Sequence, residues 1–246
     1  MCSVIELLKN RGYFIQNNCG RYELLSSYYN REEIDHLSML LEQNNVGKLH
    51  ENKYIEIFDD VNISKIKQEL MSRDSGCESI NIFEDYSCLK TEHAYLDFYI
   101  HCVEPYIAKY IKSLWCCGLK TYYTCDGFHN KNHPHFGFAI VGLYEYFDIF
   151  HKAMWKFKLD GIFKGIKWDE DYTRIKLGKN KEKVYSALMS CADFIFENRN
   201  ELISIRIKAY NQTILEEPNS NEDFKEKFFK ICEKFFKQTT FKEISK

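Results

Sequence analysis

The sequence predicts a helix-rich α+β protein, in the form of a compact two-layer domain with a small β-sheet. The hydrophobic fraction of 45% and the aromatic fraction of 16%, spread over 246 residues, are enough to build a substantial core. The chain has only 3 prolines, so long helices can form without interruption. In the second half, helical and alternating apolar patterns follow each other in the order α-β-β-α-β-α.

The first 75 residues predict a small region of helices and a hairpin, and residues 1–75 are therefore a candidate subdomain. Asn18-Cys19-Gly20 is a turn signal between two short alternating segments. A helix is expected before this hairpin, ending at Gly12, and further elements are expected after it: a helix over 31–43, a strand over 53–58 and a helix over 64–72 that is capped near Asn62 or Ser64.

Residues 73–91 have the weakest pattern and mark the candidate boundary before a main α+β domain over 92–210. The expected elements of this domain are a helix over 92–117 that is bent or restarted at Pro105, strands over 119–125 and 135–142, a helix over 143–157, a strand over 172–177 and a helix over 181–209. Residues 219–246 contain an amphipathic helix with an apolar stripe that includes Phe224, Phe228 and Cys232. We expect this stripe to dock on the core of its own chain or on a second subunit, which would make a homo-oligomer.

The charge balance limits the classes of partner. Lys and Arg number 34 against 36 Asp and Glu, and this balance argues against strong non-specific binding of nucleic acid. No apolar run reaches the roughly 18 residues of a membrane span, and the N-terminus does not read as a signal peptide. The 10 cysteines form no C-x-x-C pair, so we expect mostly free, buried thiols and a cytoplasmic location.

The residue types that carry chemistry are concentrated between Cys116 and Phe138. Three Cys, three His and one Asp lie around one predicted hairpin, whose connection of about nine residues exceeds the usual two to five. Extra length between two well-patterned strands often marks a functional loop. Three hypotheses compete for this segment, beside the simpler one that it is an ordinary strand and turn.

The first hypothesis is a zinc or iron site formed by Cys125, His129, His133 and His135, with Asp126 as a further ligand, because imidazole suits either metal. The second is catalysis, with Cys125 as nucleophile and His129 or His135 as base. The third is recognition of a nucleotide or a flipped base. In that case polar groups would fix the ligand and Tyr or Phe rings would stack on it. The polar groups are Thr121, Thr124, Asp126 and the amide of Gly127.

The segment Gly-Leu-Lys-Thr-Tyr-Tyr-Thr-Cys-Asp-Gly-Phe-His, which follows Leu114-Trp115, resembles a motif of uncharacterised bacterial and phage proteins. In those proteins a helix that ends near Trp is followed by Gly-Ile-x-Thr-x-x-Ser-Cys-x-Gly-His. A more distant similarity is to the wybutosine-synthesis tRNA methyltransferase family, whose motif is Ser-Ser-Cys-Ser-Gly-Arg. The resemblance covers residues 114–138 and implies that the marked positions are Thr121, Thr124, Cys125, Gly127 and His129. Phe128 stands where those families have His or Arg.

Lys179 follows Gly178 just before a predicted helix, where backbone amides can bind phosphate, although Asn180 as a plain N-cap explains the same pattern. Together these features predict a ligand-binding or enzymatic protein that acts on a small-molecule, nucleotide or RNA-derived ligand through the Thr121–His135 hairpin. Cys125 or Asp126 would carry the reactive step, and His129, His133 or His135 would serve as acid/base or metal ligand. The alternative is a non-catalytic interaction or regulatory protein, phage- or defence-related, in which the C-terminal helix binds a partner.

Overall fold

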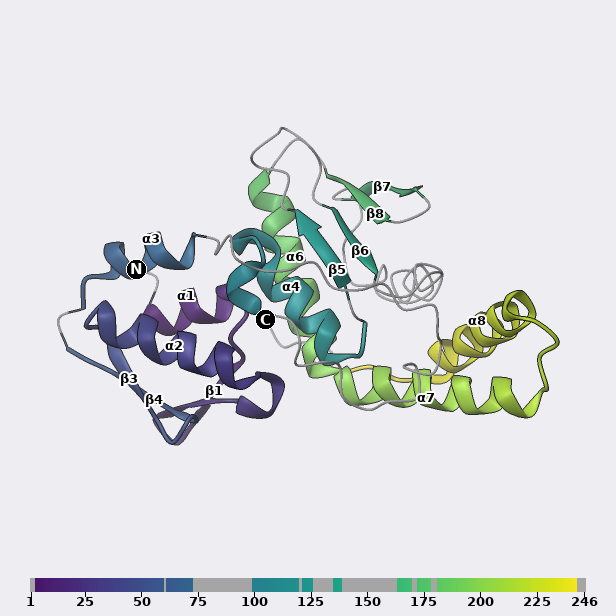
Figure 1. Ribbon diagram of the computed structural model, residues 1–246, viewed down its shortest axis with the longest axis horizontal. Helices are drawn as coiled ribbons and strands as arrows, with labels where there is room; N and C mark the ends of the chain where they lie inside the picture. Colours follow the sequence, from purple (N-terminus) through teal and green to yellow (C-terminus); the bar gives the residue numbers. More distant parts are fainter. Residues whose placement is uncertain are drawn as a thin grey trace. The chain divides into compact units, whose positions relative to one another are not determined.

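The computed structural model describes residues 3–59, 61–72, 99–119, 121–125, 135–138, 163–169, 172–177 and 181–242. The chain divides into two units, one formed by the described residues up to 72 together with residues 99–112, and the other by the described residues from 113 onward. Each unit contains a four-stranded antiparallel sheet and helices (Figure 1). The prediction of a helix-rich α+β protein is therefore confirmed.

The first unit follows the predicted order of helices closely. Its elements are α1 (Val4–Arg11), β1 (Ile15–Asn18), β2 (Arg21–Leu24), η1 (Ser26–Tyr28), α2 (Arg31–Gln43), β3 (Gly47–His50), β4 (Tyr54–Ile57), α3 (Ile63–Leu70) and η3 (Ile100–Cys102). Local signals explain the boundaries, because α1 and α2 each begin with a capping box and Asn62 caps α3. Gly12 ends α1 in the left-handed region at φ 104°, as predicted.

Strand β3 was not predicted, because the turn that joins it to β4 lacks the usual glycine. Glu51 and Asn52 occupy this turn with φ values of 52° and 56°, whereas Cys19 and Gly20 form the turn of the first hairpin. The strand order is β1-β2-β4-β3, so the second strands of the two hairpins pair at the centre of the sheet. The first unit is thus built from two successive helix-hairpin segments.

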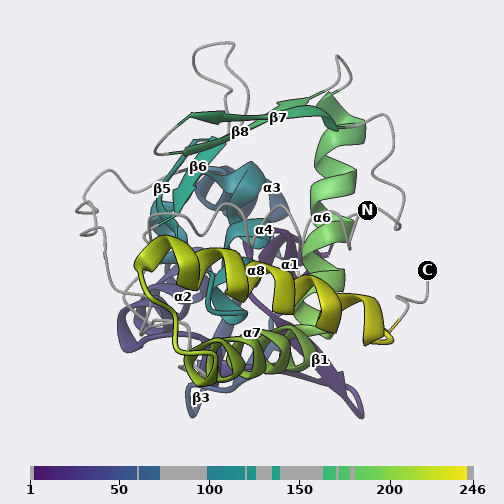
Figure 2. The same cartoon turned by 90° about the vertical axis from the view of Figure 1, so that its right-hand side faces the viewer.

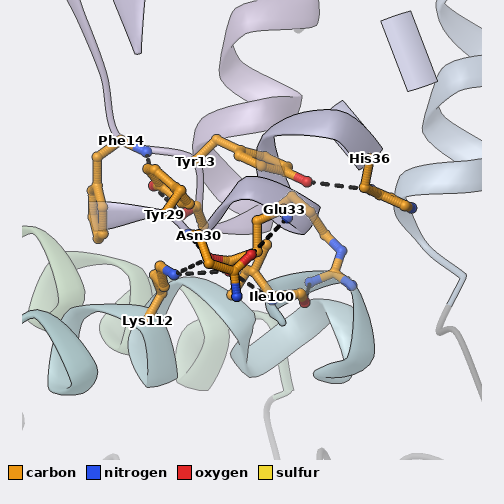
Figure 3. Close-up of polar contacts among 10 residues, drawn as sticks. Tyr13, Phe14, Tyr29, Asn30, Glu33, His36, Ile100 and Lys112 are labelled. Atoms are coloured by element: carbon orange, nitrogen blue, oxygen red, sulfur yellow. Dashed lines mark hydrogen bonds and ion pairs between the residues drawn. The ribbon is translucent and has the colours of Figure 1, made fainter. Parts of the chain in front are cut away.

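An ion pair lies in the interior of the first unit (Figure 3). Nζ of Lys112 donates to both carboxylate oxygens of Glu33 at 2.8 Å, and the two side chains are 2% and 0% exposed. The same carboxylate accepts the N–H groups of Ile100 and Asn30, and Nζ lies 4.4 Å from the ring centroid of Tyr29. Burial raises the pKa of Glu33, and Lys112 opposes that shift. Glu33 therefore joins a helix cap, a buried cation and η3 in one contact network.

The second unit begins inside α4 (Pro105–Cys116) and continues with β5 (Thr121–Cys125), β6 (His135–Phe138), β7 (Phe163–Asp169), β8 (Tyr172–Leu177), α6 (Lys181–Glu197), α7 (Arg199–Leu215) and α8 (Asn221–Gln238). The strand predicted over 172–177 is present as β8, and β7 was not predicted. The expected helix over 143–157 and the expected boundary over 73–91 lie outside the described residues.

The helix expected over 92–117, bent or restarted at Pro105, starts anew there in the described part: η3 is followed by Val103, which has extended backbone, and α4 begins at Pro105. The helix expected over 181–209 is two helices that meet at Asn198. The buried amide of Asn198 accepts from the N–H of Lys242 at 2.7 Å and donates to its carbonyl at 3.2 Å. The break therefore depends on a contact with residues near the end of the chain.

The apolar stripe of α8 is buried within the second unit. Helices α7 and α8 pack side by side (Figure 2), and the ring of Phe224 lies edge-on to Tyr210 of α7 with centroids 5.7 Å apart. Phe228 and Cys232 are also buried, at 1% and 0% exposed. Among the helices in the described part of the chain, none is long and apolar enough to cross a membrane.

Candidate functional site

Four of the predicted site residues lie in two paired strands of the second unit. Thr121, Thr124 and Cys125 belong to β5, and His135 begins β6. The other predicted site residues lie outside the described residues: Asp126, Gly127, His129, His133 and Lys179.

The strand register brings Cys125 and His135 together. The two residues are direct partners in the antiparallel pair formed by β5 and β6. Direct partners occupy the same face of a sheet, since successive residues of a strand alternate between faces. Thr124 is paired with Phe136 and therefore lies on the opposite face from Cys125. A sulfur nucleophile and an imidazole base thus share a face, while Thr124 does not share it.

The same row of partners continues across the whole sheet. His135 is paired with Arg174 of β8, and Arg174 is paired with Lys167 of β7. We name these four residues the Cys125 row: Cys125, His135, Arg174 and Lys167. Lys167 was not predicted as a site residue because β7 was not recognised as a strand, and Arg174 was not because the pairing of β6 with β8 cannot be read from the sequence. The alternation of Lys167 and Asp169 with Ile166 and Trp168 was the available signal.

The two faces of this sheet differ in composition. Besides the Cys125 row, the register places Tyr123, Tyr172, Lys176 and Asp169 on the first face. The other face carries mainly apolar residues, namely Phe136, Phe138, Ile166, Trp168, Ile175 and Leu177. An antiparallel sheet with one apolar and one polar face commonly packs the apolar face against a core. The polar face, with two tyrosines, three cations and a histidine, is the one suited to a polar ligand.

A tight helix end fixes where β5 begins. Gly118 follows α4 with φ 81°, and the N–H of Leu119 donates back to the carbonyl of Leu114 at 3.0 Å. A Cβ on Gly118 would collide with the guanidinium of the buried Arg206. Glycine is therefore required at this position for both its backbone conformation and its size.

The cysteines just before β5 are packing residues. Cys116 and Cys117 are free thiols that are 6% and 2% exposed. Burial raises the pKa of Cys117 well above its ordinary value, which keeps the thiol protonated and unreactive. Cys191 and Cys232 are also free and buried, as expected. The expectation of a free thiol is wrong for Cys102, which is disulfide-bonded. Pairing depends on which cysteines the fold brings together, and sequence spacing does not report this.

In the described part of the chain no group of three or more His, Cys, Asp or Glu residues is arranged to hold a metal ion. The proposed metal ligand His133 lies outside that part, so zinc or iron binding stays a prediction. No protein-family model, curated protein or solved structure matches the chain.

Proposed function

We propose that the protein binds a nucleotide or an RNA-derived ligand on the polar face of the β5-β6-β8-β7 sheet, with Cys125 and His135 as its reactive pair. The observation that carries the proposal is the strand register, which aligns Cys125, His135, Arg174 and Lys167 in four neighbouring strands. Imidazole next to a thiol favours the thiolate, which is the nucleophilic form of cysteine.

Arg174 and Lys167 supply the charge that a phosphate group needs. Guanidinium and ammonium groups are the usual partners of phosphate in proteins, and Arg can bind it through two parallel hydrogen bonds. Tyr123 and Tyr172 lie on the same face and provide rings on which a base can stack. Asp126, His129 and Lys179 remain further candidates for contacts around this face, whereas Thr121 is the strand partner of Phe138 and lies on the other face.

The first experiment tests the reactive pair by the rate at which iodoacetamide alkylates Cys125 at pH 6–9, read by peptide mass spectrometry. Cys19 is free and exposed in another part of the chain, so it serves as the internal reference thiol. We expect His135→Ala to slow the alkylation of Cys125 at the low end of this pH range by about tenfold, with no effect on Cys19. The same pH profile for Cys125 in the wild type and in His135→Ala would contradict the pairing.

The second experiment tests the ligand by titrating the full chain with mononucleotides and short RNA oligonucleotides. Arg174→Ala should weaken binding by about tenfold or more, because charge-assisted hydrogen bonds contribute about 1.5–3 kcal/mol. Arg31→Ala is the matched control, since the Arg31 side chain is 92% exposed and lies on α2. Metal analysis of the same preparation tests the zinc or iron hypothesis. If that hypothesis holds, the wild type contains the metal and His135→Ala loses it.

The alternative, an interaction protein that binds its partner through the C-terminal helix, has less support. The apolar stripe of α8 is already buried against α7, so it offers little apolar surface to a partner or to a second subunit. A deletion of residues 219–246 should therefore unfold the second unit, whereas a partner-binding helix could be removed without unfolding it.

A further inference from the structure

A pocket of about 280 Å³ lies in the first unit and is unrelated to the Cys125 row. The end of α1, helix α2, the end of α3 and η3 form its walls. Its lining includes Arg11, Tyr13, His36, Leu40, Glu69 and His101. The volume is close to the lower limit of small-molecule sites, which span roughly 300–1,000 Å³, so it suits a ligand the size of a single ring system.

One wall of the pocket is a stack of aromatic rings. The imidazoles of His36 and His101 lie with their centroids 4.2 Å apart and their planes within 14°, and Tyr99 stacks on His101 at 5.5 Å. The hydroxyl of Tyr13 lies 3.5 Å from Nδ1 of His36. Figure 3 shows Tyr13 and His36 meeting at this contact. Stacked rings present a flat surface of the kind on which planar heterocycles stack.

Buried polar contacts hold this wall in place. The guanidinium of Arg11 donates to three carbonyl oxygens, those of Ile100 at 2.7 Å, His101 at 3.0 Å and Val103 at 2.9 Å. Burial lowers the pKa of Arg11 to about 10, so the group stays charged at neutral pH. The carboxylate of Glu33 also accepts the N–H of Ile100 at 2.8 Å. His101 is therefore positioned before any ligand arrives.

The other side of the pocket supplies a carboxylate and apolar surface. Oε2 of Glu69 accepts a hydrogen bond from the amide of Asn44 at 2.6 Å, which orients the carboxylate. Leu40 and Leu70 are buried and line the pocket beside it. Arg11 and Glu69 carry opposite charges, so the lining as a whole favours neither an anion nor a cation.

From this arrangement we infer that the pocket is a second ligand site, which takes an uncharged planar heterocycle with N–H donors, of the nucleobase class. The ring of the ligand stacks on the imidazole wall, and its N–H or exocyclic amino group donates to the carboxylate of Glu69. Carboxylates accept from the amino group of cytosine in this way, and stacking contributes roughly 1–3 kcal/mol per base. The inference does not depend on the proposed function of the sheet.

The test is a calorimetric titration of the full chain with cytosine, adenine and guanosine. At least one of these compounds should bind, and Glu69→Gln should weaken its binding by about tenfold, because the amide replaces one acceptor oxygen with a donor. Glu42→Gln is the matched control, since Glu42 is exposed on α2, and it should leave binding unchanged. Absence of binding by all three compounds, or equal affinity in the wild type and Glu69→Gln, would overturn the inference.

Two further arms separate stacking and charge from simple occupation of the pocket. His36→Ala should weaken binding about tenfold, whereas His36→Phe keeps a flat ring and should stay within threefold of the wild type; equal losses in both would overturn the stacking contact. Benzylamine tests the charge class, and tighter binding of this cation than of cytosine would overturn the assignment of an uncharged ligand. Cys125→Ser and Arg174→Ala should leave these affinities unchanged, so the inference about the pocket can be disproved independently of the proposal about the sheet.

Discussion

The two sheets of this protein share one strand order but differ in how their charged side chains are paired across strands. In both, two hairpins are joined through their second strands, as β1-β2-β4-β3 and as β5-β6-β8-β7. In the first sheet, two carboxylates have partners across neighbouring strands. Nζ of Lys53, just before β4, lies 2.9 Å from the carboxylate of Glu23, and Nε2 of His50 lies within hydrogen-bond distance of that of Glu56, at 2.7 Å. Opposite charges on adjacent strands contribute modestly to sheet stability.

In the second sheet, like charges occupy directly opposite positions. Arg174 is the direct partner of Lys167, and like charges placed directly opposite each other destabilise a sheet. Natural proteins tend to break such local rules at functional sites. Strand order therefore does not distinguish the two sheets, whereas the placement of Arg174 directly opposite Lys167 does.

The largest expected effect concerns the interior of the first unit. Lys112→Met should lower the free energy of unfolding by about 3–5 kcal/mol, because it leaves the carboxylate of Glu33 buried without its cation. Chemical denaturation followed by circular dichroism measures the change. Lys67→Met, on the exposed side of α3, is the control and should stay within about 0.5 kcal/mol of the wild type. A small loss for Lys112→Met would mean that the buried pair is not what stabilises this unit.

The next effect compares two glycines with similar backbone conformation, one in each unit. Gly20→Ala should cost only the left-handed backbone strain, about 1–2 kcal/mol, because no atom lies within 4 Å of the added Cβ. Gly118→Ala should cost clearly more, since its Cβ would collide with the guanidinium of Arg206. Thermal unfolding of both variants measures the difference. Equal losses of stability in the two variants would show that the Arg206 side chain can move away from the added Cβ at no energetic cost.

A charge reversal tests the second sheet directly. Arg174→Glu places a carboxylate opposite Lys167, and it should raise the stability of the second unit by about 0.2–1 kcal/mol. The same variant should lose binding of any anionic ligand, because the cation is replaced by a negative charge. Denaturation and nucleotide titration on one preparation measure both quantities. Lower stability together with unchanged binding would remove the argument from like charges.

The smallest expected effect is the pH response of the first sheet. The hydrogen bond from Lys53 holds the pKa of Glu23 below its ordinary value of 4.5, with a further contribution from Asn18. Because the folded-state pKa is lowered, this contribution to stability is present above the ordinary value and is lost as the pH falls through the lowered one. NMR titration of the Glu23 carboxyl measures the shift, and Lys53→Gln should return the pKa toward 4.5. An unchanged pKa of Glu23 in Lys53→Gln would show that Lys53 is not the cause of the lowered pKa.

Local signals made several elements predictable. The helix over 31–43 was predicted with the observed bounds from its regular apolar stripe, and a capping box of Asn30 and Glu33 begins it in the structure. The hairpin at Asn18-Cys19-Gly20 was predicted because its turn contains glycine. Strand β3 was not predicted, because its hairpin turn contains no glycine. The break at Asn198 was not predicted either, because it depends on a contact with a residue 44 positions away.

For the candidate sites, the sequence by itself identified Cys125 and His135 as reactive residue types near one hairpin. Their alignment with Arg174 and Lys167 was decided by the pairing of β6 with β8 and of β8 with β7, which joins residues far apart in the chain. The pocket in the first unit could not be predicted from the sequence, since His36 and His101 lie 65 positions apart and only the fold stacks their rings. Residue chemistry and local backbone preference are properties of short segments, whereas proximity is set by packing of the whole chain.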